Sequence, residues 1–241
     1  MANKKKLEAR MEAERKAKQA RTIQIVGGGI VVLVIALGIW LFSPKTASAP
    51  SVDVPVAAVG DQTACEPFAD IPAGAQYSEP PRRIDTSKQY FATVRMANGG
   101  EFVMQLYPDK APVTVNSFVF LACKGFYNGV TFHRVLQDFM AQTGDPTGTG
   151  GGGPGYQFVN EDSDLVFDKE GVVAMANAGR DTNGSQFFIT FGPQAYLNGG
   201  YTIFGQVVQG MDVVRSITLR DPQTGPSFTG DVMESVTITV Q

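Results

Sequence analysis

The chain has 241 residues, of which 43% are hydrophobic and 18% are charged, a composition that suits a folded domain. Its net charge of −3 is unevenly distributed: residues 1–21 carry eight basic and three acidic side chains, and the rest of the chain carries 12 basic and 20 acidic ones. Nucleic-acid binding depends on positive charge that displaces counterions from phosphate, so the acidic body argues against a nucleic-acid partner.

The first two segments are typical of a membrane anchor. Residues 1–22 form a basic segment, which we predict to be cytoplasmic and to include a solvated helix. Attraction to anionic lipid beside the anchor is compatible with this prediction. Residues 23–42 follow with almost no polar side chain, and at about 1.5 Å per residue a helix of this length spans roughly 30 Å, the thickness of a bilayer core. Because the positive charge precedes this run, we expect a cytoplasmic N-terminus. We predict a retained transmembrane helix; the alternatives are a cleaved signal peptide and a buried helix.

Residues 43–87 predict an extended linker, because they contain seven of the 14 prolines and show no sustained helical or strand period. The distal part of this linker is expected to pack on the edge of the following domain. It includes Cys65, one of two cysteines in the chain. Disulfides persist outside the cytoplasm, so Cys65 and Cys123 either form a bridge or remain free thiols. Two thiols and one histidine are too few for a zinc site.

Residues 88–241 predict a domain of many short strands. The runs 89–96 and 101–107 are separated by Asn-Gly-Gly, which is a hairpin signal. Pro112 suits the first turn of a helix that Gly125 ends. One face of this helix is apolar, with Val115, Phe118, Val119 and Ala122. A second short helix is expected over 210–218. The remaining strand-like runs are 130–136, 139–143, 171–177, 185–190, 201–208 and 232–240. Many short strands with few helices favour a closed barrel or a sandwich.

Two familiar motifs do not fit this chain. The glycines at 148–153 match G-x-G-x-x-G, but neither the preceding strand nor the following helix of a dinucleotide site is present, so we expect a surface loop. A Ser-His-Asp hydrolase would have to use His133, the only histidine, and no serine lies in a nucleophile elbow.

Three long segments, 132–158, 171–190 and 196–214, resemble the cyclophilin family of peptidyl-prolyl cis–trans isomerases. The resemblance covers residues 88–241 in unbroken motif order and does not include 1–87. It implies a mainly β fold, a closed eight-stranded antiparallel barrel capped by two α-helices, with the site in a groove on the outer surface. Together with the predicted anchor, it indicates a bacterial, membrane-anchored member.

The chemistry of this family needs no cofactor, because no bond is broken. Rotation about an X–Pro amide is opposed by a barrier of about 18–20 kcal/mol. A catalyst must hold the proline and stabilise the twisted amide better than the planar one. The resemblance assigns this role to Arg134, whose guanidinium stays protonated and can donate to the amide. The alternative for Arg134 is a surface ion pair with Asp138 or Asp145.

The resemblance also assigns the remaining site residues. The proline pocket would comprise Phe139, Met140, Phe188 and Leu197. Gln142 and Gln186 would hold the substrate and position the arginine, and Ala176 and Asn177 would pair with the peptide backbone. Tyr201 and His133 complete the substrate-binding set, with His133 expected mainly to support the groove wall. Because side chains alternate along a strand, Phe187 and Phe188 should point to opposite faces, one into the core and one into the groove.

The sequence departs from many family members at two positions. Tyr196 replaces a tryptophan and Tyr201 replaces a histidine that lines the groove. Neither position supplies the cationic donor, so isomerisation should survive, but affinity for cyclosporin is expected to be weakened by Tyr196.

The favoured interpretation is an exported, membrane-anchored isomerase that assists the folding of exported proteins and acts on proline-containing polypeptides. A non-catalytic module that binds proline-containing segments is the alternative from another class, and a component of a larger assembly is a third.

Overall fold

The computed structural model describes residues 63–69 and 78–241, which belong to one compact unit. The predicted basic segment, the predicted transmembrane helix at 23–42 and residues 43–62 and 70–77 of the predicted linker lie outside the described residues. Within the described residues, no helix has the length and apolar character that crossing a bilayer requires.

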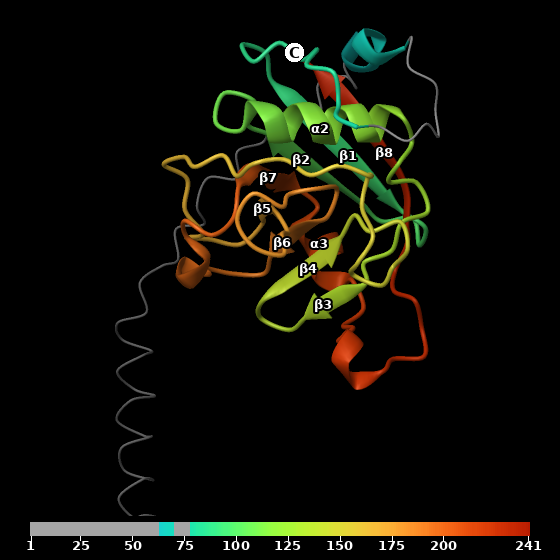
Figure 1. Ribbon diagram of the computed structural model, residues 1–241. Coiled ribbons are helices and arrows are strands. Elements are labelled where there is room, and N and C mark those ends of the chain that lie inside the picture. Colours follow the sequence, from blue (N-terminus) through green and yellow to red (C-terminus); the bar gives the residue numbers. More distant parts are fainter. Residues whose placement is uncertain (1–62, 70–77) are drawn as a thin grey trace, which may run out of the picture. The chain divides into compact units, whose positions relative to one another are not determined.

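Eight strands form one sheet whose order is β3-β4-β6-β5-β7-β2-β1-β8, and all neighbouring pairs are antiparallel (Figure 1). Each predicted strand-like run overlaps one of these strands. Their bounds are β1 (Tyr90–Met96), β2 (Glu101–Leu106), β3 (Arg134–Leu136), β4 (Met140–Thr143), β5 (Val172–Met175), β6 (Phe187–Thr190), β7 (Ile203–Gln209) and β8 (Met233–Val240).

The sheet curls but does not close, so the predicted closed barrel is wrong. Strands β3 and β8 are its two edges, and no ladder joins them among the described residues. The free edge of β3 is instead occupied at one point, where Val135 and Arg220 exchange backbone hydrogen bonds of 2.7 and 2.9 Å. The segment before β3 meets the start of β8 through an isolated bridge between Thr131 and Val232. Three backbone hydrogen bonds flank it, Gly129 to Met233, Met233 to Val130 and Phe132 to Asp231. These contacts lie outside the strand ladders, so β3 and β8 remain the two edges of the sheet among the described residues.

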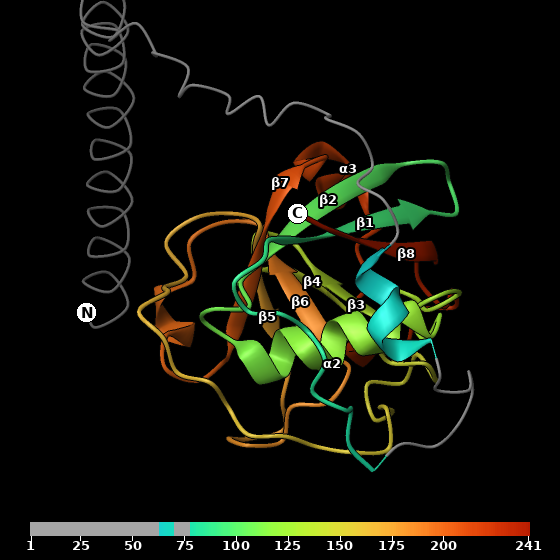
Figure 2. The ribbon, with the colours of Figure 1, turned by 90° about the horizontal axis from the view of Figure 1, so that it is seen from above.

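The two α-helices occur where they are predicted. Helix α2 (Pro112–Cys123) packs over the core that the sheet encloses, and α3 (Met211–Ser216) lies between β7 and β8 in the chain (Figure 2). In the part of the chain that the structure describes, three short 3-10 helices accompany them: η1 (Thr63–Phe68), η2 (Ala195–Leu197) and η3 (Pro222–Thr224).

Helix α2 is buried from Thr114 to Ala122, not only on the predicted apolar face. Its other side is covered by the segment that precedes β1. Asn116 accepts a hydrogen bond from the backbone N–H of Arg83 at 2.9 Å and donates one to the carbonyl of Pro81 at 3.0 Å. The distal part of the predicted linker therefore completes the helix surface instead of leaving it to solvent.

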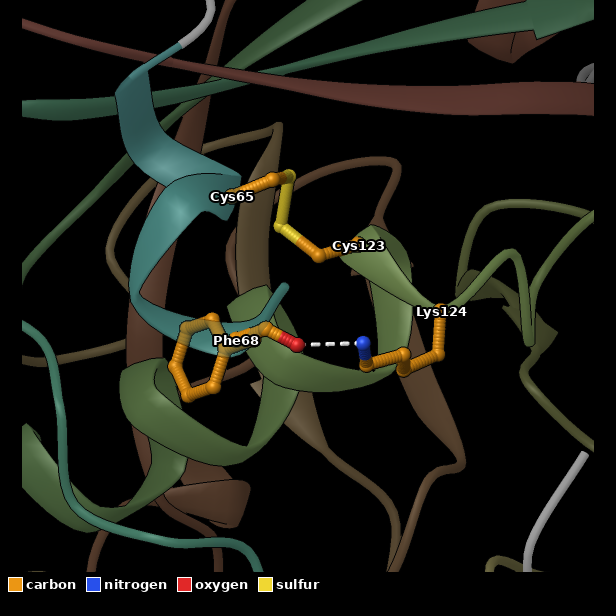
Figure 3. The surroundings of a disulfide bond; sticks show 4 residues. All are labelled: Cys65, Phe68, Cys123 and Lys124. Atoms are coloured by element: carbon orange, nitrogen blue, oxygen red, sulfur yellow. Dashed lines mark hydrogen bonds between the residues drawn. A yellow bond between two sulfur atoms is a disulfide. The ribbon is translucent and has the colours of Figure 1, made fainter. Parts of the chain in front are cut away.

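Helix η1 holds a second part of this segment against α2. A disulfide joins Cys65 to Cys123, with a Cα–Cα distance of 5.3 Å (Figure 3). Beside it, the Lys124 ammonium donates to the Phe68 carbonyl, and the buried Phe68 ring lies 5.4 Å from that of Phe120. The covalent bond and the buried aromatic pair together attach η1 to the end of α2.

The sheet separates two apolar clusters, as its alternating side chains require. The inner face contributes to the main core, which includes Phe187 and the α2 residue Phe118. The outer face carries a second, smaller cluster that includes Phe188. The prediction that Phe187 and Phe188 point to opposite faces of the sheet is confirmed.

Replacing both cysteines, Cys65→Ser with Cys123→Ser, should lower the free energy of unfolding by about 4 kcal/mol, because a bridge across a sequence separation of 58 restricts the unfolded chain. Urea unfolding followed by circular dichroism measures this. Reductant should destabilise the native chain and leave the double variant unchanged. Two titratable thiols in the unreduced native protein would contradict the bridge.

Candidate active site

The site begins with a row of side chains across four strands. Arg134 on β3 is paired with Gln142 on β4, and Gln142 is paired with Phe188 on β6. Phe188 is in turn paired with Ala174 on β5. Because directly opposite residues in a sheet point to the same face, this register places a cation, an amide and an aromatic ring side by side on the outer surface.

The second apolar cluster continues this row. Its buried members are Met140, Phe167, Val172, Ala174, Phe188, Leu197 and Ile203, and its partly exposed edge is formed by Leu136, Phe139, Leu165, Ala176 and Tyr201. Phe188 stacks on Phe167, with ring centroids 5.9 Å apart, and meets Tyr201 edge-on at 5.4 Å. All four residues predicted for the proline pocket therefore belong to one cluster.

Polar side chains adjoin the cluster. The Arg134 guanidinium donates to the Gln142 oxygen at 3.3 Å, and the Gln142 amide nitrogen donates to the Gln186 oxygen at 3.0 Å. The same guanidinium lies 5.8 Å from the centre of the Phe139 ring, within range of a cation–π interaction. Arg134 is thus held between the Gln142 amide and the face of the Phe139 ring. The alternative of an ion pair with Asp138 or Asp145 is not seen in the described residues.

A groove of about 710 Å³ runs beside these groups. Four residues predicted to bind substrate line it, namely Gln142, Ala176, Asn177 and Gln186. The glycine-rich segment 150–155 forms part of its wall, as a loop and without the helix of a dinucleotide site. Because Ala176 belongs to both the groove and the edge of the apolar cluster, the two form a continuous surface.

His133 does not lie in this groove. It precedes Arg134, so its side chain points to the opposite side of the chain and is only 2% exposed. Among the described residues, neither ring nitrogen has a hydrogen-bond partner. Burial lowers the pKa of His133, and the charge of Asp145 opposes this in part. This position fits the predicted supporting role behind the groove wall, and the assignment of His133 to the substrate-binding set stays a prediction.

Tyr196 is the most exposed aromatic residue near the site. Its side chain is 71% exposed, and its ring lies 6.1 Å from that of Phe139. Asn177 uses its side chain locally, since its amide donates to the Gly200 carbonyl at 3.2 Å and accepts from Gly179.

Two residues of the site were missed. Phe167 lies in an irregular segment without a strand period, so no sequence pattern could have predicted that its ring stacks on Phe188. Asp145 is 1% exposed and accepts hydrogen bonds from the backbone N–H and hydroxyl of Thr147 at 2.7 and 2.8 Å. The Asp-Pro-Thr order after a strand is a turn signal that could have indicated this capping role.

The ionisation of Asp145 follows from these contacts. Burial by itself would raise the pKa of its carboxyl group. Hydrogen bonds from Thr147, Gly152 and Gly150 outweigh this effect and lower the pKa to about 2. The group is consequently a carboxylate near neutral pH and can accept several donors at once.

Comparison with known proteins agrees with this geometry. Residues 91–239 match the family model of the cyclophilin type peptidyl-prolyl cis-trans isomerases. The chain is 52% identical over 137 residues to the peptidyl-prolyl cis-trans isomerase-like 1 proteins of Mus musculus and Homo sapiens, covering 55% of this chain and 82% of each relative. It is 43% identical over 144 residues to peptidyl-prolyl cis-trans isomerase B of Bacillus subtilis, covering 59% of this chain and 94% of that protein.

A solved structure is also similar. The cyclophilin type peptidyl-prolyl cis-trans isomerase of Cryptosporidium parvum has a TM-score of 0.57 and 30% identity, and the match covers 63% of this chain and 98% of that one. Fold, site and relatives together define an isomerase of X–Pro peptide bonds. The chain belongs to the cyclophilin-type peptidyl-prolyl cis-trans isomerase family.

Replacing His133 by Phe should remove part of the acid sensitivity of the fold. The pKa of His133 in the folded protein is below 6.5, so just below that pH the unfolded chain binds more protons than the folded one. The free energy of unfolding therefore falls as the pH drops from about 6.5 through the lowered pKa. Above about pH 6.5 the histidine is neutral in both states and this effect is absent. Urea unfolding at about pH 7 and about pH 5 compares the two proteins. An identical pH dependence in both would contradict the prediction.

Proposed function

We propose that Arg134 catalyses isomerisation by donating a hydrogen bond to the nitrogen of the twisted X–Pro amide. The observation that carries this proposal is the placement of its guanidinium, which is bonded to Gln142 and lies over Phe139 at the edge of the second apolar cluster. In the twisted state the amide nitrogen regains its lone pair and becomes a better acceptor than in the planar state. A fixed cationic donor therefore lowers the energy of the transition state more than that of the bound substrate.

The second apolar cluster is proposed to hold the proline ring. Its buried members present an apolar surface, and Phe139, Ala176 and Tyr201 remain partly exposed at its edge. A proline ring placed there would lose contact with water while its amide faced Arg134. No proton transfer or cofactor is needed for this reaction, since only a torsion changes.

The groove is proposed to bind the peptide that carries the proline. Proline-containing polypeptides fit this function, and the Cryptosporidium parvum enzyme has also been solved in the presence of the dipeptide Ala-Pro, with a TM-score of 0.56 and 31% identity to this chain. We further propose that cyclosporin binds weakly, because the exposed Tyr196 stands where many family members have tryptophan.

We also propose that the domain is anchored in a membrane by residues 23–42, faces away from the cytoplasm and assists the folding of exported proteins. The support is the uncharged run after a basic segment, together with a disulfide, which persists outside the cytoplasm. The relatives include animal and bacterial proteins, so the bacterial source stays a prediction.

Arg134→Ala should reduce the catalysed rate by about a hundredfold, which corresponds to the loss of one charge-assisted hydrogen bond in the transition state. Exchange of an X–Pro peptide, measured by NMR, reports the rate, and circular dichroism checks the fold. Arg95→Ala is the matched control, because Arg95 is a strand arginine that pairs with Glu234 at 3.0 Å on the far part of the sheet. If the native chain binds the peptide but leaves exchange at the uncatalysed rate, the binding module is favoured instead.

Cell fractionation should place the chain in the membrane fraction at its full size, with the isomerase domain accessible to protease added to intact spheroplasts. A chain lacking residues 1–49 is the control and should be recovered in the soluble fraction. A native product shortened by about 49 residues would indicate a cleaved signal peptide, and a domain that protease cannot reach would contradict the orientation.

A further inference from the structure

The buried carboxylate of Asp145 has no part in the chemistry proposed above, yet it organises one wall of the groove. One of its oxygens accepts from the N–H and hydroxyl of Thr147, and the other accepts from the Gly150 N–H at 2.6 Å. These bonds join the end of β4 to the glycine-rich loop that follows it. Within the loop, the Thr149 hydroxyl also accepts from the Gly151 N–H at 3.2 Å, and Asp145 is the charged group that ties the loop to the end of β4.

The glycines of this loop fit the carboxylate closely. A Cβ atom at Gly152 would lie 2.0 Å from an Asp145 oxygen and 2.9 Å from Thr147. Gly150 has φ of +88°, in the left-handed region that side chains rarely adopt. The contacts around Asp145 therefore require glycine at 152, and the backbone conformation favours glycine at 150.

The loop in turn orients Gln186. The amide nitrogen of Gln186 donates to the carbonyls of Gly150 and Gly152, each at 2.9 Å. Both hydrogens of that amide are thus engaged, so the Gln186 oxygen must point the other way, toward Gln142.

The direction of every following hydrogen bond is then determined. The Gln186 oxygen accepts from the Gln142 nitrogen, so Gln142 turns its own oxygen to Arg134. If the amide of Gln142 were reversed, its NH₂ group would face the guanidinium, donor against donor. Each amide thereby passes its orientation to the next, and the final acceptor holds the arginine in place.

From this continuous chain of contacts we propose that Asp145 is a positioning residue for the isomerase, acting on Arg134 through the glycine loop, Gln186 and Gln142. The proposal rests on the catalytic role proposed for Arg134. Asp145 itself touches neither the groove surface nor the peptide, since it does not line the groove and is buried. Its effect should therefore fall on the rate of rotation and not on the affinity for peptide.

The first test is Asp145→Asn in the 241-residue chain. Asparagine keeps the shape of aspartate but has one oxygen, so it can retain the Thr147 turn only by presenting an NH₂ group to the Gly150 N–H. We expect kcat for an X–Pro peptide to fall about tenfold and KM to stay within about twofold. Gly152→Ala should give the same pattern, because its methyl group would displace the carboxylate.

Asp85→Asn is the matched control. Asp85 accepts from the N–H and hydroxyl of Ser87 at 3.0 and 2.7 Å, the same arrangement that Asp145 has with Thr147, but it lies before β1 and outside the chain of contacts. Its replacement should leave kcat and KM unchanged.

A second readout separates positioning from a general loss of structure. In ¹⁵N NMR spectra, the side-chain signals of Gln186, Gln142 and Arg134 should shift or broaden in Asp145→Asn and remain in place in Asp85→Asn. A folded Asp145→Asn protein with native kcat, or with unshifted Gln142 and Arg134 signals, overturns the proposal. If Arg134→Ala retains the native rate, the catalytic proposal fails instead, and the NMR signals still decide whether Asp145 orients the arginine.

Discussion

The strand register that pairs Arg134 with Gln142 and Gln142 with Phe188 is the constraint on which the rest of the site depends. Side chains alternate with a period of two, so a slip of one residue would turn this whole set into the core. It would also bring His133 to the surface in place of Arg134. The burial of the large inner cluster opposes such a slip, which means that the core on one face secures the chemistry on the other.

The outer face combines two kinds of organisation. The apolar cluster around Phe188 has seven buried members, and five partly exposed residues form its edge. Beside it, hydrogen bonds connect Arg134 to Gln142, Gln142 to Gln186 and Gln186 to the loop that Asp145 holds. Each amide in this series has one orientation that satisfies both of its neighbours. Packing sets where a proline ring would rest, and hydrogen bonding sets which way the donor points.

The segment before β1 belongs to the domain although the family match begins at residue 91. The disulfide and Phe68 attach η1 to α2, and Asn116 binds the backbone near Pro81. Because this segment covers the outer side of α2, the helix is buried almost all round. A helix that packed on a sheet with its other side in water would carry polar residues on that side.

The sequence alone determined the strands, both α-helices, the opposite faces of Phe187 and Phe188, and the family with its motif residues, because these depend on local periodicity and on contiguous segments. Only the tertiary structure decided that the sheet stays open, that α2 is covered on its outer side, that His133 is buried and that Asp145 is connected to Arg134. The physical reason is that these features depend on contacts between residues far apart in the sequence. Val135 bonds to Arg220, and Gln142 bonds to Gln186, whereas the periodicity of a strand or helix relates only near neighbours in the chain.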